Sequence, residues 1–265
     1  MRTMDFVTRA GKFIVRNTLR DPLYLLRYAV AYIQTTYVTP VEFLSIGELT
    51  SLIHRGKSLI RMGDGEIYIM NHGSVHYQPY NSLLRQKLLK IIKEYRDSSP
   101  YVLGIPKTYI EMTNVELRKK HMLRMWLPFK IMYRYFFPRG MTYFDAHTFY
   151  EQGFETHLKS LIEESHTIIV TNKETISKLK QRGLEGKITS TFIETPSQDA
   201  FKEYEAIFEK TIHTLQLHPN AKILVSMGPA AKVLVYDLSK KGYAAYDIGR
   251  GLEVIYSDES LAHLI

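Results

Sequence analysis

From residue 45 onward, short apolar runs alternate with longer segments in which apolar residues recur every three or four positions. Short runs of apolar or β-branched residues are typical of buried strands, whereas the longer spacing is typical of helices with one buried face. The runs that predict strands are 58–62, 101–105, 167–170, 188–193, 222–226 and 243–248. Strands that alternate with helices predict an α/β fold, here a Rossmann-like and mostly parallel sheet flanked by helices.

Capping and turn residues mark where the predicted helices begin and end. Ser45 and Glu48 form a capping box, which predicts a helix as far as Arg55 that Gly56 ends. Further helices are predicted at 82–96, 111–139, 173–181, 197–215 (with Ser197 as N-cap) and 230–241. The last helix lies between two predicted strands, so this βαβ unit should have parallel strands and a right-handed crossover.

Residues 1–44 differ in composition from the rest and are predicted to form a basic, aromatic helical arm before one large domain at 45–265. Residues 1–36 contain six Lys or Arg and two acids. The apolar stretch 24–38 is interrupted by polar residues and is too short and too polar for a transmembrane span. The arm either packs on the main domain or on a second subunit, which we favour, or lies on an anionic membrane surface. The sequence leaves the oligomeric state open.

The chain has 265 residues, no cysteine and a formal net charge of +8. The absence of cysteine excludes disulfides and thiolate metal sites, and it fits a reducing compartment. Because no secretory signal pattern is visible, we expect a cytoplasmic protein, with a peripheral position at the inner membrane face if the arm binds lipid. The positive charge favours anionic partners such as phosphates, nucleic acid or an acidic membrane.

A second basic segment, 118–139, contains seven Lys or Arg and no acid, with aromatic residues between them. Such a pattern can bind single-stranded nucleic acid, but it is more often a helix with one buried aromatic face and one solvated basic face. We therefore do not expect nucleic acid as a partner.

The segment 61–66, Arg-Met-Gly-Asp-Gly-Glu, is the strongest candidate for chemistry. It follows a predicted strand, and on a strand Asp64 and Glu66 would point to the same side. Two hard carboxylate ligands at a strand end suit Mg²⁺ or Mn²⁺ that carries a phosphate. The alternative is a tight Asp-Gly turn whose acids are merely solvated.

Other loop residues follow predicted strands at the edge where ligands bind in open α/β sheets. They are Thr171, Thr195, the turn Ser226–Pro229 and Asp247. The helix that begins after Gly228 would direct its free N–H groups and its dipole toward an anion.

Four motifs occur in a fixed order: 61–66, Tyr-Gln-Pro-Tyr at 77–80, Ser-Met-Gly-Pro-Ala-Ala-Lys-Val-Leu at 226–234, and Asp-Ile-Gly at 247–249. Together they resemble the GT-D type glycosyltransferases, a family long catalogued as a domain of unknown function, over residues 45–255. The resemblance implies a Rossmann-like enzyme that transfers a sugar from a nucleotide-sugar donor. It also implies Mn²⁺ or Mg²⁺ held through the Asp-x-Glu motif, Asp64 and Glu66, which would then be the catalytic and metal-binding residues.

Further residues are candidates for the donor site, and several of them have a structural alternative. They are Arg61 and Gly63 (diphosphate, or an ion pair for Arg61), Gln78 (substrate, or a loop hydrogen bond, which we favour), Thr195 and Gln198 (nucleotide, or a turn), Gly228 and Pro229 (diphosphate), Asp247 (a sugar hydroxyl, or a turn cap) and Arg250. Arg250 stands where we expect His in the family pattern, and Arg cannot ligate a cation. Asp145 and His147 are weaker candidates for the acceptor side.

We therefore expect a hexosyltransferase that uses a nucleoside-diphosphate sugar such as UDP-glucose. Its acceptor would be a glycan, lipid-linked or protein-linked, in surface polysaccharide or glycoprotein assembly. The alternative is a non-catalytic nucleotide or nucleic-acid binding module that retains the fold. Arg250 keeps that alternative open.

Overall fold

The computed structural model describes residues 40–150, 166–181 and 190–252, together with 26, 29–30, 32–33 and 35–36. Most of the predicted arm, the predicted strand residues 188–189 and Gly183 lie outside the described residues. The chain divides into two compact units, one formed by Met1–Pro40 with Tyr109–Tyr135 and the other by Val41–Thr108 with Phe136–Ile265. The boundary that composition places after residue 44 stays a prediction.

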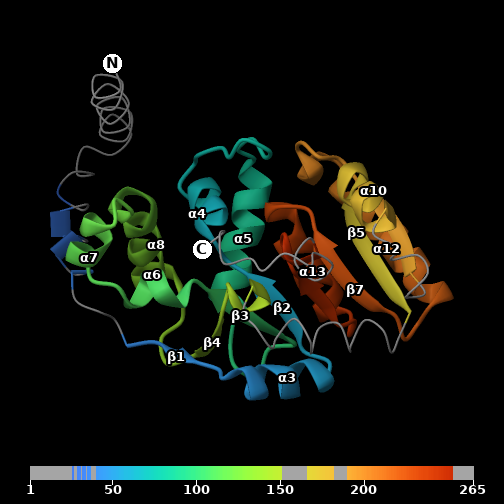
Figure 1. The fold of residues 1–265 in the computed structure, drawn as a ribbon, viewed down its shortest axis with the longest axis horizontal. Helices are drawn as coiled ribbons and strands as arrows, with labels where there is room; N and C mark the ends of the chain where they lie inside the picture. The colour runs from blue at the N-terminus through green and yellow to red at the C-terminus, as the bar shows by residue number, and fades with distance from the viewer. Residues whose placement is uncertain are drawn as a thin grey trace. The chain divides into compact units, whose positions relative to one another are not determined.

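The larger unit contains one eight-stranded sheet in which every strand pair is parallel, as expected for a Rossmann-like α/β fold (Figure 1). The strands are β1 (Glu42–Phe43), β2 (Ser58–Arg61), β3 (Tyr101–Ile105), β4 (Thr142–Asp145), β5 (Thr167–Asn172), β6 (Ser190–Thr195), β7 (Lys222–Ser226) and β8 (Ala245–Asp247). Their order in the sheet is β1-β4-β3-β2-β8-β7-β5-β6. The sequence analysis missed β1 and β4.

The helices of this unit connect the parallel strands. They are α3 (Ile46–His54), α4 (Asp64–Met70), α5 (Ser82–Glu94), α10 (Lys173–Gln181), α12 (Tyr204–Leu217) and α13 (Pro229–Lys240), with short 3₁₀ turns η1 (Thr148–Tyr150) and η2 (Ala200–Glu203). Helix α13 contacts β2, β7 and β8 and also packs against α5 and α12. It is therefore the central helix of its layer.

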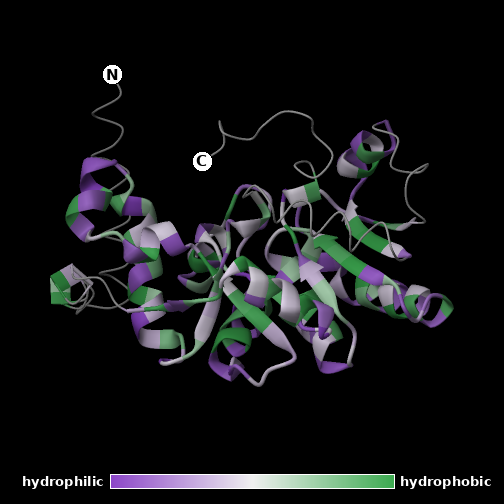
Figure 2. Cartoon of the chain, turned by 60° about the horizontal axis from the view of Figure 1, so that its bottom comes forward, coloured by the Kyte–Doolittle hydropathy of each residue, from purple (hydrophilic) through white to green (hydrophobic). Residues whose placement is uncertain are grey.

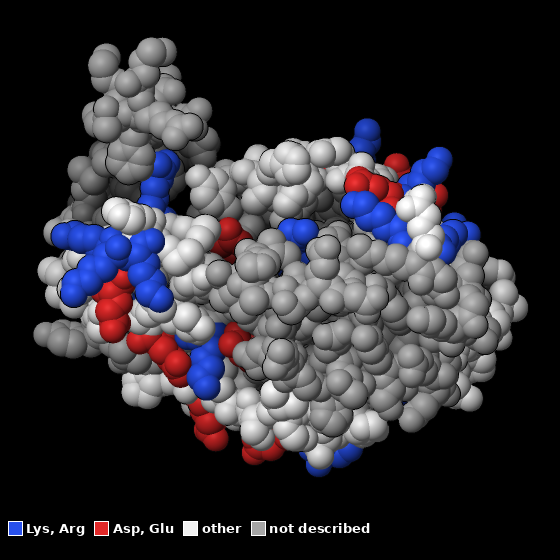
Figure 3. Space-filling view, viewed as in Figure 1, with Lys and Arg blue, Asp and Glu red and all other residues white. Residues whose placement is uncertain are grey.

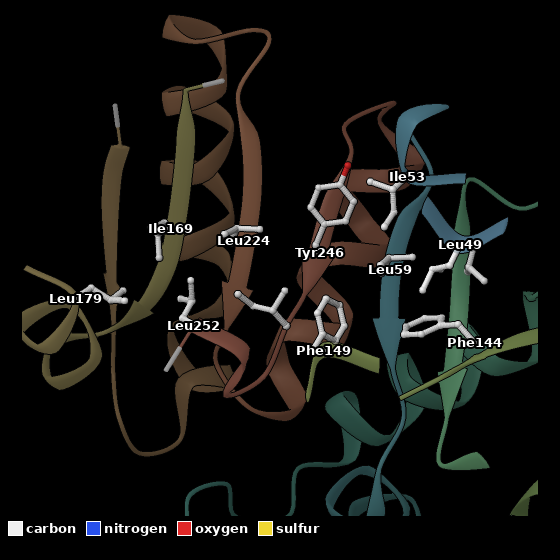
Figure 4. Close-up of a cluster of buried hydrophobic side chains, with 12 residues drawn as sticks. Leu49, Ile53, Leu59, Phe144, Phe149, Ile169, Leu179, Leu224, Tyr246 and Leu252 are labelled. Atoms are coloured by element: carbon white, nitrogen blue, oxygen red, sulfur yellow. The ribbon is translucent and has the colours of Figure 1, made fainter. Parts of the chain in front are cut away.

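A buried apolar cluster fills the space between the sheet and helices α3 and α10 (Figure 4). Leu59, Leu224 and Tyr246 contribute to it from neighbouring strands, and Figure 2 shows the corresponding hydrophobic stretches along the sheet. Since successive strand residues point to opposite faces, Asp247 must point away from this cluster and toward the layer of α13.

Local sequence explains where the helices start. Ser45 and Glu48 form the predicted capping box of α3. The Asn81 side chain accepts hydrogen bonds from two backbone N–H groups at the start of α5. Pro229 occupies the first turn of α13, where its missing N–H costs nothing.

The range 111–139 is mostly helical, as predicted, but it is divided between α7 (Asn114–Lys119) and α8 (Leu123–Phe136), and α6 (Lys107–Glu111) ends at its first residue. Thr113 starts α7 with a capping box, and His121 has a left-handed backbone (φ 58°) between α7 and α8. Both interrupt helical hydrogen bonding.

In the described part of the smaller unit, the aromatic side chains of Trp126, Phe129 and Tyr133 are buried, whereas Tyr135 is exposed. The Trp126 ring stacks on Tyr109 at 4.0 Å and meets Phe129 edge-on. Basic side chains lie at the surface over α7, where Arg118 and Lys119 occupy the last turn (Figure 3). Lys130 of α8 is instead buried and donates to the Met112 carbonyl oxygen. Across the described parts of the chain, no helix has both the length and the apolar character needed to cross a membrane.

Candidate functional site

The strand order changes direction between β2 and β8, at the centre of the sheet. From β2 the chain adds β3 and then β4 on one side, whereas β5 to β7 lie on the other side of β8. Ligands of open parallel sheets bind at the carboxyl ends of strands near such a switch point. Arg61, Asp247 and Ser226 end β2, β8 and β7, so this edge is the candidate site.

The Asp-x-Glu segment has a different conformation from the one the sequence predicted. We expected a turn that directs Asp64 and Glu66 to the same side, and this is wrong because the residues begin helix α4, with Gly63 as N-cap. Residues two positions apart in a helix are rotated by about 200° around the helix axis, so these two side chains point to nearly opposite sides of α4. Asp64 is exposed, whereas residue Glu66 is only 5% exposed, and its Oε2 accepts a hydrogen bond of 2.8 Å from the Gly63 N–H.

Lys232, which the sequence analysis did not select, lies at the centre of the site. Its Nζ is 3.1 Å from Glu66 Oε1, 3.1 Å from Asp247 Oδ2 and 3.3 Å from the Gly228 carbonyl oxygen. Burial acts to lower the pKa of Lys232, but the carboxylates of Asp247 and Glu66 outweigh burial and raise it. The side chain therefore carries a positive charge.

The Asp247 side chain, at the end of β8, forms a hydrogen bond with the backbone at the end of β2. Its Oδ2 accepts a hydrogen bond of 3.1 Å from the Arg61 N–H, while its Oδ1 is buried and has no hydrogen-bond partner among the described residues. The Arg61 guanidinium donates to the Ile248 carbonyl oxygen at 2.9 Å and lies so close to Gly249 that a Cβ there would be 2.4 Å from Arg61 Nη1. The diphosphate role of Arg61 stays a prediction.

The loop before α5 places an aromatic ring on the N-terminus of α13. A Cβ at Gly228 would lie 2.8 Å from the Tyr77 ring, and a Cβ at Gly65 would lie 3.3 Å from the Tyr77 hydroxyl. Burial, together with the charges of Glu66, Asp64 and Asp247, raises the pKa of Tyr77 against the opposing effect of Lys232. Tyr77 is 39% exposed, so its ring forms part of the site surface.

Gln78 fixes this loop. Its Nε2 donates to Asp199 Oδ1 at 2.5 Å, and its Oε1 accepts from the Phe201 N–H at 3.3 Å. The Asp199 N–H in turn donates to the Tyr77 carbonyl oxygen at 2.9 Å. Gln78 is buried and makes the loop hydrogen bonds that we favoured, and a contact with substrate stays a prediction.

The remaining candidates lie at other points of the same unit. Thr195 ends β6, and its buried Oγ1 has no partner in the described part of the chain. Gln198 is exposed, and Ser197 is not the predicted helix cap, because η2 starts from Asp199 in a left-handed conformation and α12 starts later. Arg250 is exposed beyond β8, so its donor role remains untested.

Asp145 ends β4, which β3 and β2 separate from β8. Its Oδ1 accepts from the backbone N–H groups of His147 at 3.0 Å and Lys107 at 3.2 Å. These contacts stabilise the loop after β4. An acceptor role for Asp145 and His147 stays a prediction.

The placement of the carboxylates decides how well a divalent ion fits. No group of three or more His, Asp or Glu side chains able to hold a metal ion occurs among the residues that the structure describes. Asp64 is open to solvent, but Glu66 directs both oxygens inward, to Gly63 and Lys232. As placed, the two acids therefore do not fit a shared ion.

Comparisons with known proteins identify the family. The model of the glycosyltransferase GT-D fold matches residues 59–256, about three quarters of the chain, so the chain belongs to the GT-D glycosyltransferase family. This confirms the resemblance stated from the four motifs.

Two curated relatives come from streptococci. The chain is 28% identical over 221 residues to the probable glycosyl transferase Gly of Streptococcus gordonii, covering 79% of this chain and 32% of that protein. It is 26% identical over 218 residues to the glycosyltransferase GlyD of Streptococcus pneumoniae, covering 76% of this chain and 25% of that protein. The chain thus spans about a third or less of the length of these relatives.

Solved structures share the fold. One, described as a new glycosyltransferase (DUF1792) from Streptococcus sanguinis, has a TM-score of 0.67 and 26% identity, covering 80% of this chain and 82% of that chain. Another, described as the highly conserved domain of unknown function 1792 with a distinct glycosyltransferase fold, has a TM-score of 0.67 and 25% identity over 84% of this chain and 82% of that chain.

Proposed function

We propose that this chain transfers a hexose from a nucleoside-diphosphate sugar to a glycan, lipid-linked or protein-linked acceptor. Membership of a glycosyltransferase family supports the proposal. The observation that carries it is the convergence of charged side chains at the switch point, where β2 and β8 end beside the N-terminus of α13. UDP-glucose is the first donor to test.

The groups at this edge suit a diphosphate leaving group. As the bond from the sugar to the diphosphate breaks, negative charge builds up on the departing nucleotide and must be stabilised. Helix α13 has twelve residues, and its N-terminus carries a partial positive charge, although Pro229 has no N–H and the Ala231 N–H already donates to the Gly228 carbonyl oxygen. We propose that this N-terminus binds the diphosphate and that the phenol of Tyr77, which covers it, contacts the donor.

Dependence on Mn²⁺ or Mg²⁺ is a further proposal, and Asp64 is the carboxylate open to such an ion. Glu66 is held by the Gly63 N–H and by Lys232, so Asp64 alone would contact the ion.

The proposal can be tested by nucleotide release from a panel of UDP-, GDP- and dTDP-sugars, with and without Mn²⁺. We expect one donor to be turned over and Asp64→Asn to slow its release by roughly tenfold or more. Glu174→Gln, an exposed acid paired with Lys178 on α10, is the matched control and should leave release unchanged. Nucleotide binding without turnover of any donor would favour the non-catalytic module.

The acceptor and the place of action are separate proposals. The six basic residues within 1–36 would attract an anionic membrane, which fits a lipid-linked acceptor. Flotation with anionic vesicles, before and after removal of residues 1–39, tests this idea. If both forms stay out of the vesicle fraction, the membrane proposal is wrong and a protein-linked or free glycan acceptor is favoured.

A further inference from the structure

Three oxygen atoms surround the Lys232 ammonium. They belong to Glu66, Asp247 and the Gly228 backbone carbonyl, all within 3.3 Å of Nζ. Lys232 is 7% exposed and Asp247 is fully buried, so bulk water contributes little to neutralising these charges. Two carboxylates and a carbonyl are also the oxygen ligands that a hard divalent ion would choose.

Both inner carboxylates pair with this one amine. Each forms an ion pair of 3.1 Å with the Lys232 Nζ. Glu66 is further held by the Gly63 N–H, and Asp247 by the Arg61 N–H. A divalent ion placed between the two carboxylates would stand against the ammonium at a similar distance, where two positive charges repel strongly in a poorly solvated site.

We propose that Lys232 is the resident cation of this oxygen-lined site and excludes a divalent ion from Glu66 and Asp247. A metal ion then meets Asp64 alone and binds weakly. The amine thus does for the two inner carboxylates what a metal ion would otherwise do: it neutralises them and holds them in place. This inference concerns ion binding by the chain and does not require sugar transfer, so the two proposals can fail separately.

Mn²⁺ binding, followed by the loss of the free-ion electron paramagnetic resonance signal, tests the proposal on the purified full chain. Lys232→Met keeps an unbranched side chain and removes the charge, and we expect it to bind Mn²⁺ roughly tenfold tighter or more than the wild type. Adding Glu66→Gln to Lys232→Met should abolish the gain. Lys240→Met, a surface lysine of the same helix paired with Glu94, is the matched control and should bind like the wild type.

Two results would overturn the proposal. One is a folded Lys232→Met variant that binds Mn²⁺ no tighter than the wild type. The other is that, with Lys232 intact, Glu66→Gln weakens Mn²⁺ binding as much as Asp64→Asn does. If Lys232→Met does not fold, a crystal structure of the wild type soaked in Mn²⁺ decides the question. The ammonium between Glu66 and Asp247 supports the proposal, and an ion coordinated by Glu66 refutes it.

Discussion

Gly228 is the position at which one added methyl group should be most informative. Its backbone (φ 59°, ψ −143°) is one that L side chains rarely adopt, and a Cβ would lie 2.8 Å from Tyr77 Cε2. Backbone strain of this kind costs about 1–3 kcal/mol. Forcing an extra methyl group into a packed contact adds about 1–3 kcal/mol.

Gln78 and Asp199 hold the backbone of the Tyr77 loop, so the contact can be relieved only if the Tyr77 ring itself turns out of its position. We therefore expect Gly228→Ala to lower the free energy of unfolding by roughly 2–6 kcal/mol, the sum of the two effects. Urea unfolding measures this directly, and the slope with urea should stay unchanged if the folded state stays compact.

Two other glycines separate the contributions. Gly242 has φ 88° and open space around its Cβ position, so Gly242→Ala reports backbone strain alone. Gly47 in α3 has open space and a helical backbone, so Gly47→Ala should stabilise by about 0.5–1 kcal/mol. In a double-mutant cycle, Tyr77→Ala should recover the contact share of the Gly228→Ala cost. The reasoning fails if Gly228→Ala costs no more than Gly242→Ala, or if the cycle shows no coupling to Tyr77.

Three further predictions test the packing of charge and polarity. Lys232→Met should lower the free energy of unfolding by roughly 3–5 kcal/mol, since it leaves two buried carboxylates without their positively charged partner. Added Mn²⁺ should restore part of this loss in a thermal melt. An equal loss in Lys240→Met would contradict the role given to Lys232. The Tyr246 hydroxyl is buried without a hydrogen-bond partner among the described residues, and burial raises the pKa of Tyr246 to about 12. The neutral Tyr246 hydroxyl therefore favours the folded state fully below pH 10, and this contribution to the free energy of unfolding is lost as pH rises from 10 toward 12. Tyr246→Phe should match the wild type in unfolding free energy at pH 7 and lose less of it between pH 10 and 12. Identical curves of unfolding free energy against pH for the two proteins would refute this assignment. Ser45→Ala removes the cap of α3 and should cost about 1 kcal/mol in urea unfolding, and a change near zero would show that the capping box adds nothing here.

The sequence predicted the parts of the fold that local patterns determine. The βαβ unit around α13 was recognisable because two apolar runs flank a periodic segment with Pro229 at its start and Gly242 after its end. Strand β4 was missed because Thr142–Asp145 is short and lies beside aromatic residues of the preceding helix. Strand β1 has two residues, too few for any alternation to be visible.

The site was predicted less well because its geometry depends on contacts between distant segments. A strand period was applied to Asp64 and Glu66, although a glycine followed three residues later by glutamate also fits the start of a helix, with Glu66 reaching back to the Gly63 N–H. Lys232 carried one local signal, a lysine among buried apolar residues of α13, but its partners come from α4 and β8. Periodicity alone gives no information about such partners.

The central claim is that a nucleotide-sugar donor binds where β2 and β8 end beside α13. A crystal structure of the chain soaked with UDP tests it most directly. We expect the diphosphate at the N-terminus of α13, beside Gly228 and Tyr77 and within reach of Asp64. UDP bound at the opposite edge of the sheet, or held entirely by the smaller unit, would contradict it.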